Sequence, residues 1–181
     1  MSSLKELELE QRLQHLESRL QVVEDIEAIR RLKARYGQLA DLRYRRDGHG
    51  ADGPKSRDEL EPIARELASL FSEDAVWDGG RALGLCQGRE AIYQRFLEPT
   101  LHFSWHYFVK PQIQIDGDRA RATWDILAAC TTVKNVACWM SGLEEDEYVR
   151  VDGSWLHSRM QLKVIFMAPY ELGWARDSAT G

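Results

Sequence analysis

The sequence has few cysteines, no long apolar run and no excess of positive charge, and each absence excludes a class of protein. Cys86, Cys130 and Cys138 are an odd number without the C-x-x-C spacing of a structural zinc site, so we expect free thiols. No apolar segment reaches the roughly 20 residues that cross a bilayer, and residues 1–11 lack the apolar core of a signal peptide. We therefore expect a cytoplasmic protein.

Charge and motifs narrow the function further. The 181-residue chain has 24 Lys and Arg against 29 Asp and Glu, a net charge of -5. A negative chain is not attracted to phosphates, so we expect neither nucleic acid nor membrane as a partner. The glycine-rich loops of nucleotide-binding proteins and the metalloprotease and esterase signatures are also missing. Function must therefore come from scattered polar residues.

The N-terminal segment predicts one long helix with two parts. Residues 4–42 contain no Pro and one Gly, and are rich in Glu, Gln, Arg and Leu. Apolar residues at steps of four and three run from Leu9 to Val23, and this stripe changes phase near Asp25. Two heptads are too short for an independent coiled coil. We interpret residues 1–25 as a helical arm that contacts another subunit or its own domain.

The remainder predicts an α+β domain. Residues 43–57 combine Gly, Pro and charge and predict a mobile loop, and an Asp58/Glu61 capping pattern predicts a helix to about Phe71. Further along, we expect short strands at 75–77 and 83–86, a helix at 89–97, and long strands at 105–115, 120–134, 137–151 and 154–167. Helices followed by antiparallel hairpins indicate helices that cover the concave face of a curved sheet.

The histidines supply one candidate base. His15 and His49 lie in charged segments and are expected to be solvated, which leaves His102, His106 and His157. His106 starts a strand among aromatic residues, and an apolar environment favours the neutral imidazole that acts as a base near pH 7. The alternative is a core histidine that binds a backbone carbonyl.

Three other residues could complete a site with this base. Tyr36 and Asp41 lie near the end of the first core helix. An inward Asp41 would find its natural partner in a histidine and fix the ring tautomer. The alternative is a solvated Asp41, although a helix C-terminus disfavours a carboxylate. The strand pattern does not decide which face of the sheet Arg159 occupies. Arg159 could face the site, and the alternative is a surface ion pair.

Five segments carry a family resemblance. They are IEAIRRLKARYGQLADLR, LFSEDAVWDGG, GREAIYQRF, WHYFVKPQIQIDGDRARATW and DEYVRVDGSWLHSRM. Together they resemble the SnoaL-like branch of the nuclear transport factor 2 superfamily, which includes bile acid 7α-dehydratase, scytalone dehydratase, lindane dehydrochlorinase and the ketosteroid isomerases. The resemblance implies a cone-shaped α+β barrel of the cystatin-like fold, with a curved mixed or antiparallel sheet wrapped around N-terminal helices. We expect one such domain over residues 26–170 and a tail over 171–181.

The resemblance also implies a reaction. It suggests a cofactor-independent lyase or isomerase, of the dehydratase or ketosteroid isomerase type, that acts on a hydrophobic cyclic molecule such as a steroid or polyketide. His106, oriented by Asp41, would remove a proton next to an activating group. The catalytic set that matches the family is Tyr36, Asp41, His106 and Arg159, with Tyr36 and Arg159 stabilising the developing oxyanion. The expected pocket aromatics are Trp77, Trp105, Tyr107, Phe108 and Trp139.

Several alternatives stay open. The same fold could hold a hydrophobic ligand without changing it, or serve as a structural module of an oligomer, and a hydroxylase subunit is a third reading. His102 and Asp125 remain candidates for the site, but with His106 they do not form a recognisable facial triad, so we expect no metal and no cofactor. The arm and the family resemblance favour a homo-oligomer, either a dimer or a trimer.

Overall fold

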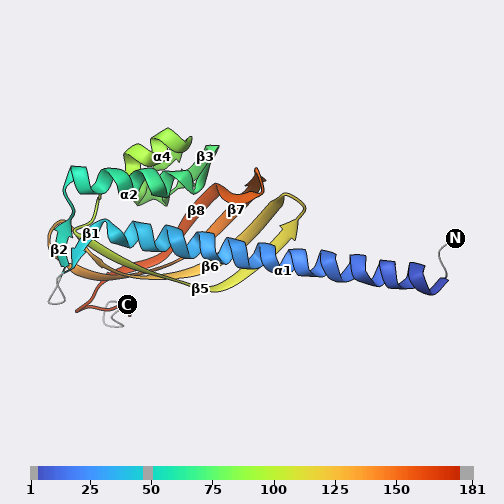
Figure 1. The fold of residues 1–181 in the computed structure, drawn as a ribbon. Helices are drawn as coiled ribbons and strands as arrows, with labels where there is room; N and C mark the ends of the chain where they lie inside the picture. Colours follow the sequence, from blue (N-terminus) through green and yellow to red (C-terminus); the bar gives the residue numbers. More distant parts are fainter. Residues whose placement is uncertain (1–3, 47–50, 176–181) are drawn as a thin grey trace.

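The computed structural model describes residues 4–46 and 51–175, which form helices packed on a curved sheet (Figure 1). The helices are α1 (Leu4–Leu42), α2 (Arg57–Ser69), α3 (Gly80–Leu83) and α4 (Arg89–Phe96). The strands are β1 (Tyr44–Arg46), β2 (Ala51–Pro54), β3 (Phe71–Asp78), β4 (Leu85–Gln87), β5 (Phe103–Asp116), β6 (Arg119–Thr131), β7 (Ala137–Val151) and β8 (Ser154–Pro169). The predicted α+β class is confirmed.

Within the described residues, one six-stranded sheet wraps around the helices in the order β4-β3-β8-β7-β6-β5. β3 and β8 run parallel, and every other neighbouring pair is antiparallel. The consecutive hairpins predicted for β5 to β8 are confirmed, with Asp152 and Gly153 in the left-handed conformation at the β7–β8 turn. α1, α2 and α4 lie along one side of this curved sheet (Figure 1).

α1 is partly free and partly packed. Residues 4–24 are exposed, and this part of the helix projects beyond the rest of the molecule (Figure 1). The first buried residue is Asp25, whose carboxylate accepts hydrogen bonds from Arg150 Nη2 at 2.7 Å and Trp155 Nε1 at 3.0 Å. From there the helix presents a buried face to the sheet, so the phase change near Asp25 coincides with the point where α1 meets the sheet.

Where the structure describes it, the segment predicted as a mobile loop is instead a β-hairpin. β1 and β2 pair in antiparallel fashion, and Tyr44 is buried. Gly53 has φ +86°, and a Cβ there would come within 2.8 Å of His102 Cε1, so glycine allows the hairpin to lie against that ring. His49 falls outside the described residues.

The helix that follows begins slightly earlier than predicted. Its capping box consists of Ser56 and Glu59, not Asp58 and Glu61, because the Glu59 carboxylate accepts from the Ser56 backbone N–H at 2.9 Å and hydroxyl at 2.7 Å. The three cysteines are free thiols, as expected. No helix in the described part of the chain is long and apolar enough to span a membrane.

Candidate active site

A cavity of about 350 Å³ lies between the helices and the inner face of the sheet. Its apolar wall includes Ile126, Met140, Met160, Leu162, Val164 and Met167. Its polar groups include Tyr36, Arg43, Asp78, Arg95, Ser104, His106 and Glu144. The volume lies within the range of small-molecule sites, at roughly 300–1,000 Å³, and the mixture of an apolar wall with a few polar groups is typical of them.

His106 and Asp41 form a hydrogen-bonded pair at this cavity. Asp41 lies in the last turn of α1, and His106 lies near the start of β5. The ring Nδ1 of His106 is 2.6 Å from Asp41 Oδ1. The backbone N–H of His106 also donates to both carboxylate oxygens, at 3.2 and 3.1 Å. The predicted inward orientation of Asp41 is therefore present, and both residues are largely buried.

This hydrogen bonding orients the imidazole ring. A carboxylate only accepts hydrogen bonds, so the Asp41 contact places the ring proton of neutral His106 on Nδ1. Nε2 is then left with a lone pair. The His106 ring also stacks on Phe108, with the two ring centroids 5.9 Å apart and an interplanar angle of 5°. The imidazole is thus fixed on two sides in a position where Nε2 can accept a proton.

Tyr36 places a hydroxyl in the same cavity. Its ring packs against Phe71, Phe96 and Phe108 at centroid distances of 6.0, 6.1 and 6.0 Å. Trp77 Nε1 donates a hydrogen bond to the Tyr36 oxygen at 3.1 Å, which leaves the tyrosine O–H free to donate elsewhere. Burial raises the pKa of Tyr36 well above its ordinary value, so the phenol stays protonated.

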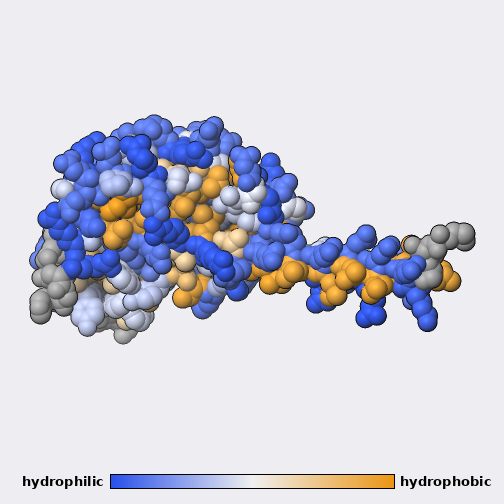
Figure 2. Space-filling view, in the orientation of Figure 1, coloured by the Kyte–Doolittle hydropathy of each residue, from blue (hydrophilic) through white to orange (hydrophobic). Residues whose placement is uncertain are grey.

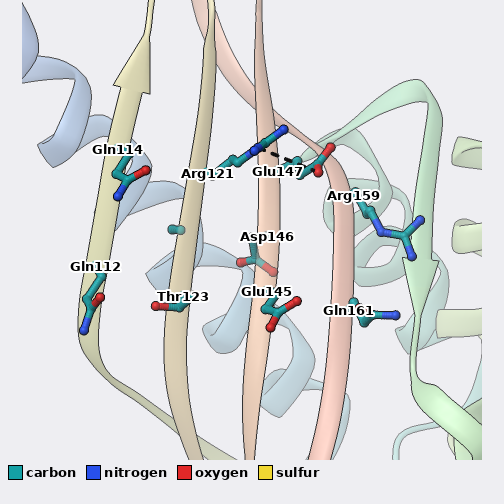
Figure 3. Close-up of a pocket in the computed structure, with 10 residues that line it drawn as sticks. Gln112, Gln114, Arg121, Thr123, Glu145, Asp146, Glu147, Arg159 and Gln161 are labelled. Atoms are coloured by element: carbon teal, nitrogen blue, oxygen red, sulfur yellow. Dashed lines mark ion pairs between the residues drawn. The ribbon is translucent and has the colours of Figure 1, made fainter.

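The structure does not bring Arg159 to these three residues. Arg159 lies on the outer face of the sheet, beside Glu145, Glu147 and Gln161 (Figure 3). Its Nη2 is 3.8 Å from Asp78 Oδ2, and its side chain is 40% exposed. Alternation along β8 explains this placement, because the neighbouring Met160 points inward and is buried. Arg159 therefore occupies the surface position, beside an acidic residue, that the alternative role of an ion pair predicts.

Among the five aromatic residues expected in the pocket, Trp77 lines the cavity. Trp105 and Tyr107 alternate with His106 along β5 and therefore point to the other face of the sheet. Trp139 pairs with Ala129 in the same outward row. Phe108 faces inward, but it fills the core beneath His106 rather than the cavity wall. These four residues were expected to line the pocket and do not: strand alternation turns three of them outward, and packing places Phe108 in the core.

The remaining sequence candidates lie elsewhere. His102 lies against Gly53, and Asp125 forms an ion pair with Lys110 at 2.5 Å. Neither residue lines the cavity. Within residues 4–46 and 51–175, no group of three or more His, Cys, Asp and Glu side chains is arranged to hold a metal ion.

Sequence reasoning missed a buried ionic network below the cavity. Lys33 Nζ donates to Asp146 Oδ2 at 2.7 Å and to Glu144 Oε2, and the Tyr148 hydroxyl donates to Asp146 Oδ2 at 2.8 Å. All four residues are buried. Burial raises the pKa of Asp146 to about 6, although the Lys33 charge acts in the opposite direction. The two carboxylates in turn outweigh burial and raise the pKa of Lys33.

This network left a signal in the sequence. Lys33 follows Ile29 by four residues and precedes Tyr36 by three, so it belongs to the buried face of α1. Glu144, Asp146 and Tyr148 alternate along β7, so they share one face of the sheet. A charge on a buried helix face requires an opposite charge nearby, and the acidic row of β7 is the matching partner.

Comparisons with known proteins agree with this architecture. A family model described as a SnoaL-like domain matches residues 63–161. That range includes His106 and Arg159, whereas Tyr36 and Asp41 precede it. No curated protein sequence is significantly similar to the chain.

Solved structures share the fold at low sequence identity. A type 2 hexachlorocyclohexane dehydrochlorinase (LinA) superposes with a TM-score of 0.66 at 21% identity, covering 88% of this chain and 98% of that one. A Novosphingobium aromaticivorans protein described as a putative scytalone dehydratase gives a TM-score of 0.63 at 21% identity, covering 85% of this chain and 97% of that one. An NTF2-like protein with a cystatin-like fold from the same organism gives 0.65 at 24%, covering 84% and 90%. These matches establish the cystatin-like cone fold.

Proposed function

The chain belongs to the SnoaL-like domain family, and from this membership and the His106–Asp41 pair we propose that it is a cofactor-independent lyase or isomerase. Its substrate would be a hydrophobic cyclic small molecule of the steroid or polyketide kind. The observation that carries the proposal is the 2.6 Å contact between His106 Nδ1 and Asp41 Oδ1 at the edge of an apolar cavity. Two of its structural neighbours are described as a dehydrochlorinase and a dehydratase, both of which catalyse eliminations.

In the proposed elimination, His106 Nε2 removes a proton from a substrate carbon next to an activating group. The electron pair of that C–H bond forms a carbon–carbon double bond, and the leaving group departs from the adjacent carbon with its bonding electrons. Asp41 holds the ring and stabilises the imidazolium that forms. The proton on His106 then passes to the departed hydroxide, or to solvent if another leaving group is used. In an isomerisation, His106 would return the proton to a different carbon.

Tyr36 would assist at the oxygen end of the substrate. Its hydroxyl is held in place by the hydrogen bond from Trp77, and it keeps its proton because burial raises the pKa of the phenol. It can therefore donate a hydrogen bond to a carbonyl oxygen that becomes an oxyanion, or to a departing hydroxyl. Arg159 is not assigned a part in this step, because it lies on the outer face of the sheet.

A turnover screen tests the proposal. Hydroxylated cyclic ketones, chlorinated cyclohexanes and hydroxyacyl thioesters form a suitable panel. We expect turnover of at least one compound, and a loss of about 100-fold or more in His106→Ala, since a general base contributes ~10²–10⁴-fold. Asp41→Asn should also lower the rate. His102→Ala is the matched control, because this ring lies outside the cavity. Turnover that persists unchanged in His106→Ala and Asp41→Asn would contradict the proposal.

The second candidate function is a non-catalytic ligand-binding module. The apolar wall of the cavity favours it, because a hydrophobic ligand would be held there without any chemistry. This candidate predicts that apolar ligands raise the melting temperature equally in the unaltered chain, in His106→Ala and in Asp41→Asn. It also predicts no turnover of any compound in the panel.

A further inference from the structure

Two arginines line the cavity without a carboxylate partner among the described residues. Arg43 follows the end of α1 and Arg95 lies in the last turn of α4. Asp78 and Glu144, which line the cavity, and Asp41, which pairs with the lining residue His106, already have hydrogen-bond partners. Asp41 binds His106, Glu144 binds Lys33, and Asp78 binds the side chain of Gln161 and the backbone of Gly80. Neither guanidinium group forms an ion pair with these carboxylates among the described residues.

Arg43 is the more deeply placed of the two. It is 8% exposed, and its Nε donates a hydrogen bond to the carbonyl oxygen of Ala40 at 3.0 Å. Its guanidinium carbon lies 4.8 Å from the centre of the Phe96 ring. Burial lowers the pKa of Arg43, and the like charge of Arg95 acts in the same direction, while the nearby Asp41 carboxylate acts in the opposite one. A buried cation of this kind is costly unless something binds it.

Arg95 and Ser104 also line this cavity, and each has an unused hydrogen-bonding atom beside it. Nη1 and Nη2 of Arg95 donate to the backbone of Glu98 and to the Thr100 hydroxyl, at 2.9 and 3.3 Å. Its Nε is buried and has no partner among the described residues. The hydroxyl of Ser104 is likewise buried and unpartnered in the described structure. Buried polar atoms are normally satisfied, so these two atoms leave hydrogen-bonding capacity unused beside the cavity.

We propose that Arg43 and Arg95 bind a carboxylate on the substrate, so that the cavity takes an apolar cyclic acid rather than a neutral molecule. The planar guanidinium fork matches the two oxygens of a carboxylate, and such charge-assisted hydrogen bonds are about twice as strong as neutral ones. The ring system of the acid would lie against Ile126, Met160 and Leu162. This inference rests on the proposed function in taking the cavity as the substrate site, and it specifies the class of substrate.

Two probes of nearly the same shape test the inference. 2-Naphthoate carries a carboxylate and 2-naphthamide a neutral amide, and isothermal titration calorimetry near pH 7 gives both dissociation constants. We expect the unaltered chain to bind naphthoate about tenfold or more tightly. Arg43→Met and Arg95→Met should each bring the ratio of the two constants close to one. Arg65→Met is the matched control, because Arg65 is an exposed arginine on α2 that pairs with Glu61 outside the cavity.

The outcomes separate this inference from the proposed function. Equal affinity for the two probes, binding of neither probe, or a preference that survives both Arg43→Met and Arg95→Met would overturn the carboxylate site. Because Arg43 is buried and its variant could unfold, Arg95→Met at the partly exposed Arg95 provides a second test of the same preference. His106→Ala should keep the preference for naphthoate. If that preference holds while neither the panel nor hydroxylated cyclic carboxylic acids are turned over, the carboxylate site stands and the lyase proposal falls. If turnover depends on His106 but naphthoate is not preferred over naphthamide, the lyase proposal stands and the carboxylate site falls.

Discussion

The hydroxyl of Tyr36 is a single group on which the proposed chemistry depends. Tyr36→Phe removes the O–H while the ring keeps its contacts with Phe71, Phe96 and Phe108. We expect kcat to fall about 10²–10³-fold, as for other oxyanion donors, with a smaller change in KM. Tyr93→Phe is the matched control, because that hydroxyl bonds Glu61 at the surface. Steady-state kinetics check this, and a Tyr36→Phe variant with unchanged kcat would remove the hydroxyl from the mechanism.

The raised pKa of Asp146 predicts how the free energy of unfolding changes with pH. Burial raises the pKa of Asp146 from 3.8 to about 6. The folded protein therefore holds a proton that the unfolded chain releases near pH 3.8, and this favours folding at low pH. The contribution is complete below pH 3.8 and is lost as the pH rises through about 6.

Urea unfolding at a series of pH values between 4 and 7 checks this prediction. Asp146→Asn keeps a neutral group at the site, so its free energy of unfolding should decline less with pH than that of the unaltered chain. Asp125→Asn is the matched control, since Asp125 is an exposed carboxylate paired with Lys110. Parallel pH profiles for the unaltered chain and Asp146→Asn would show that Asp146 titrates normally.

At the scale of elements, periodicity predicted the helices and hairpins well. The apolar steps in α1, the face of α2 and the turn at Asp152 and Gly153 are local patterns, and each produced the expected element. The β1–β2 hairpin was not predicted, because its segment lacks apolar alternation. It packs through the Tyr44 ring on Phe103, with ring centroids 6.0 Å apart, and Phe103 is distant in sequence.

The candidate site was predictable only in part for the same reason. Asp41 and His106 were expected to pair because an inward carboxylate needs a partner and because both residues match the family resemblance, although 65 residues separate them. The faces occupied by Trp105, Tyr107 and Arg159 depend on strand register, and a shift of one residue reverses every side chain. The irregular pairing of β7 with β8 between Glu147 and Tyr148 is a shift of this kind.

At the scale of the whole molecule, the free part of α1 leaves an apolar stripe uncovered. Leu9, Leu13, Leu16, Leu20 and Val23 are each at least half exposed. Figure 2 shows apolar side chains running along the projecting helix. Their alternating steps of four and three are the pattern of a helix that packs against another helix. We propose that this stripe packs against another subunit in a homo-oligomer of this chain.

Light scattering coupled to gel filtration tests this assembly. The unaltered chain should elute as a dimer or trimer, and Leu13→Gln, Leu16→Gln and Leu20→Gln combined should lower its mass. Gln14→Ala with Ser18→Ala is the matched control, because these residues occupy other faces of the same helix. An unaltered chain that is monomeric, or an assembly that withstands the three leucine substitutions, would contradict the proposed role of the arm.

The protonation of His106 tests the central claim most directly, and it needs no substrate. Nitrogen-15 NMR of labelled protein, at a pH where the ring is neutral, distinguishes the two imidazole tautomers. The 2.6 Å contact with Asp41 predicts a proton on Nδ1 and a lone pair on Nε2, and predicts that Asp41→Asn disturbs this state. A proton on Nε2, or a tautomer that is unaffected by Asp41→Asn, would contradict the assignment of His106 as the base.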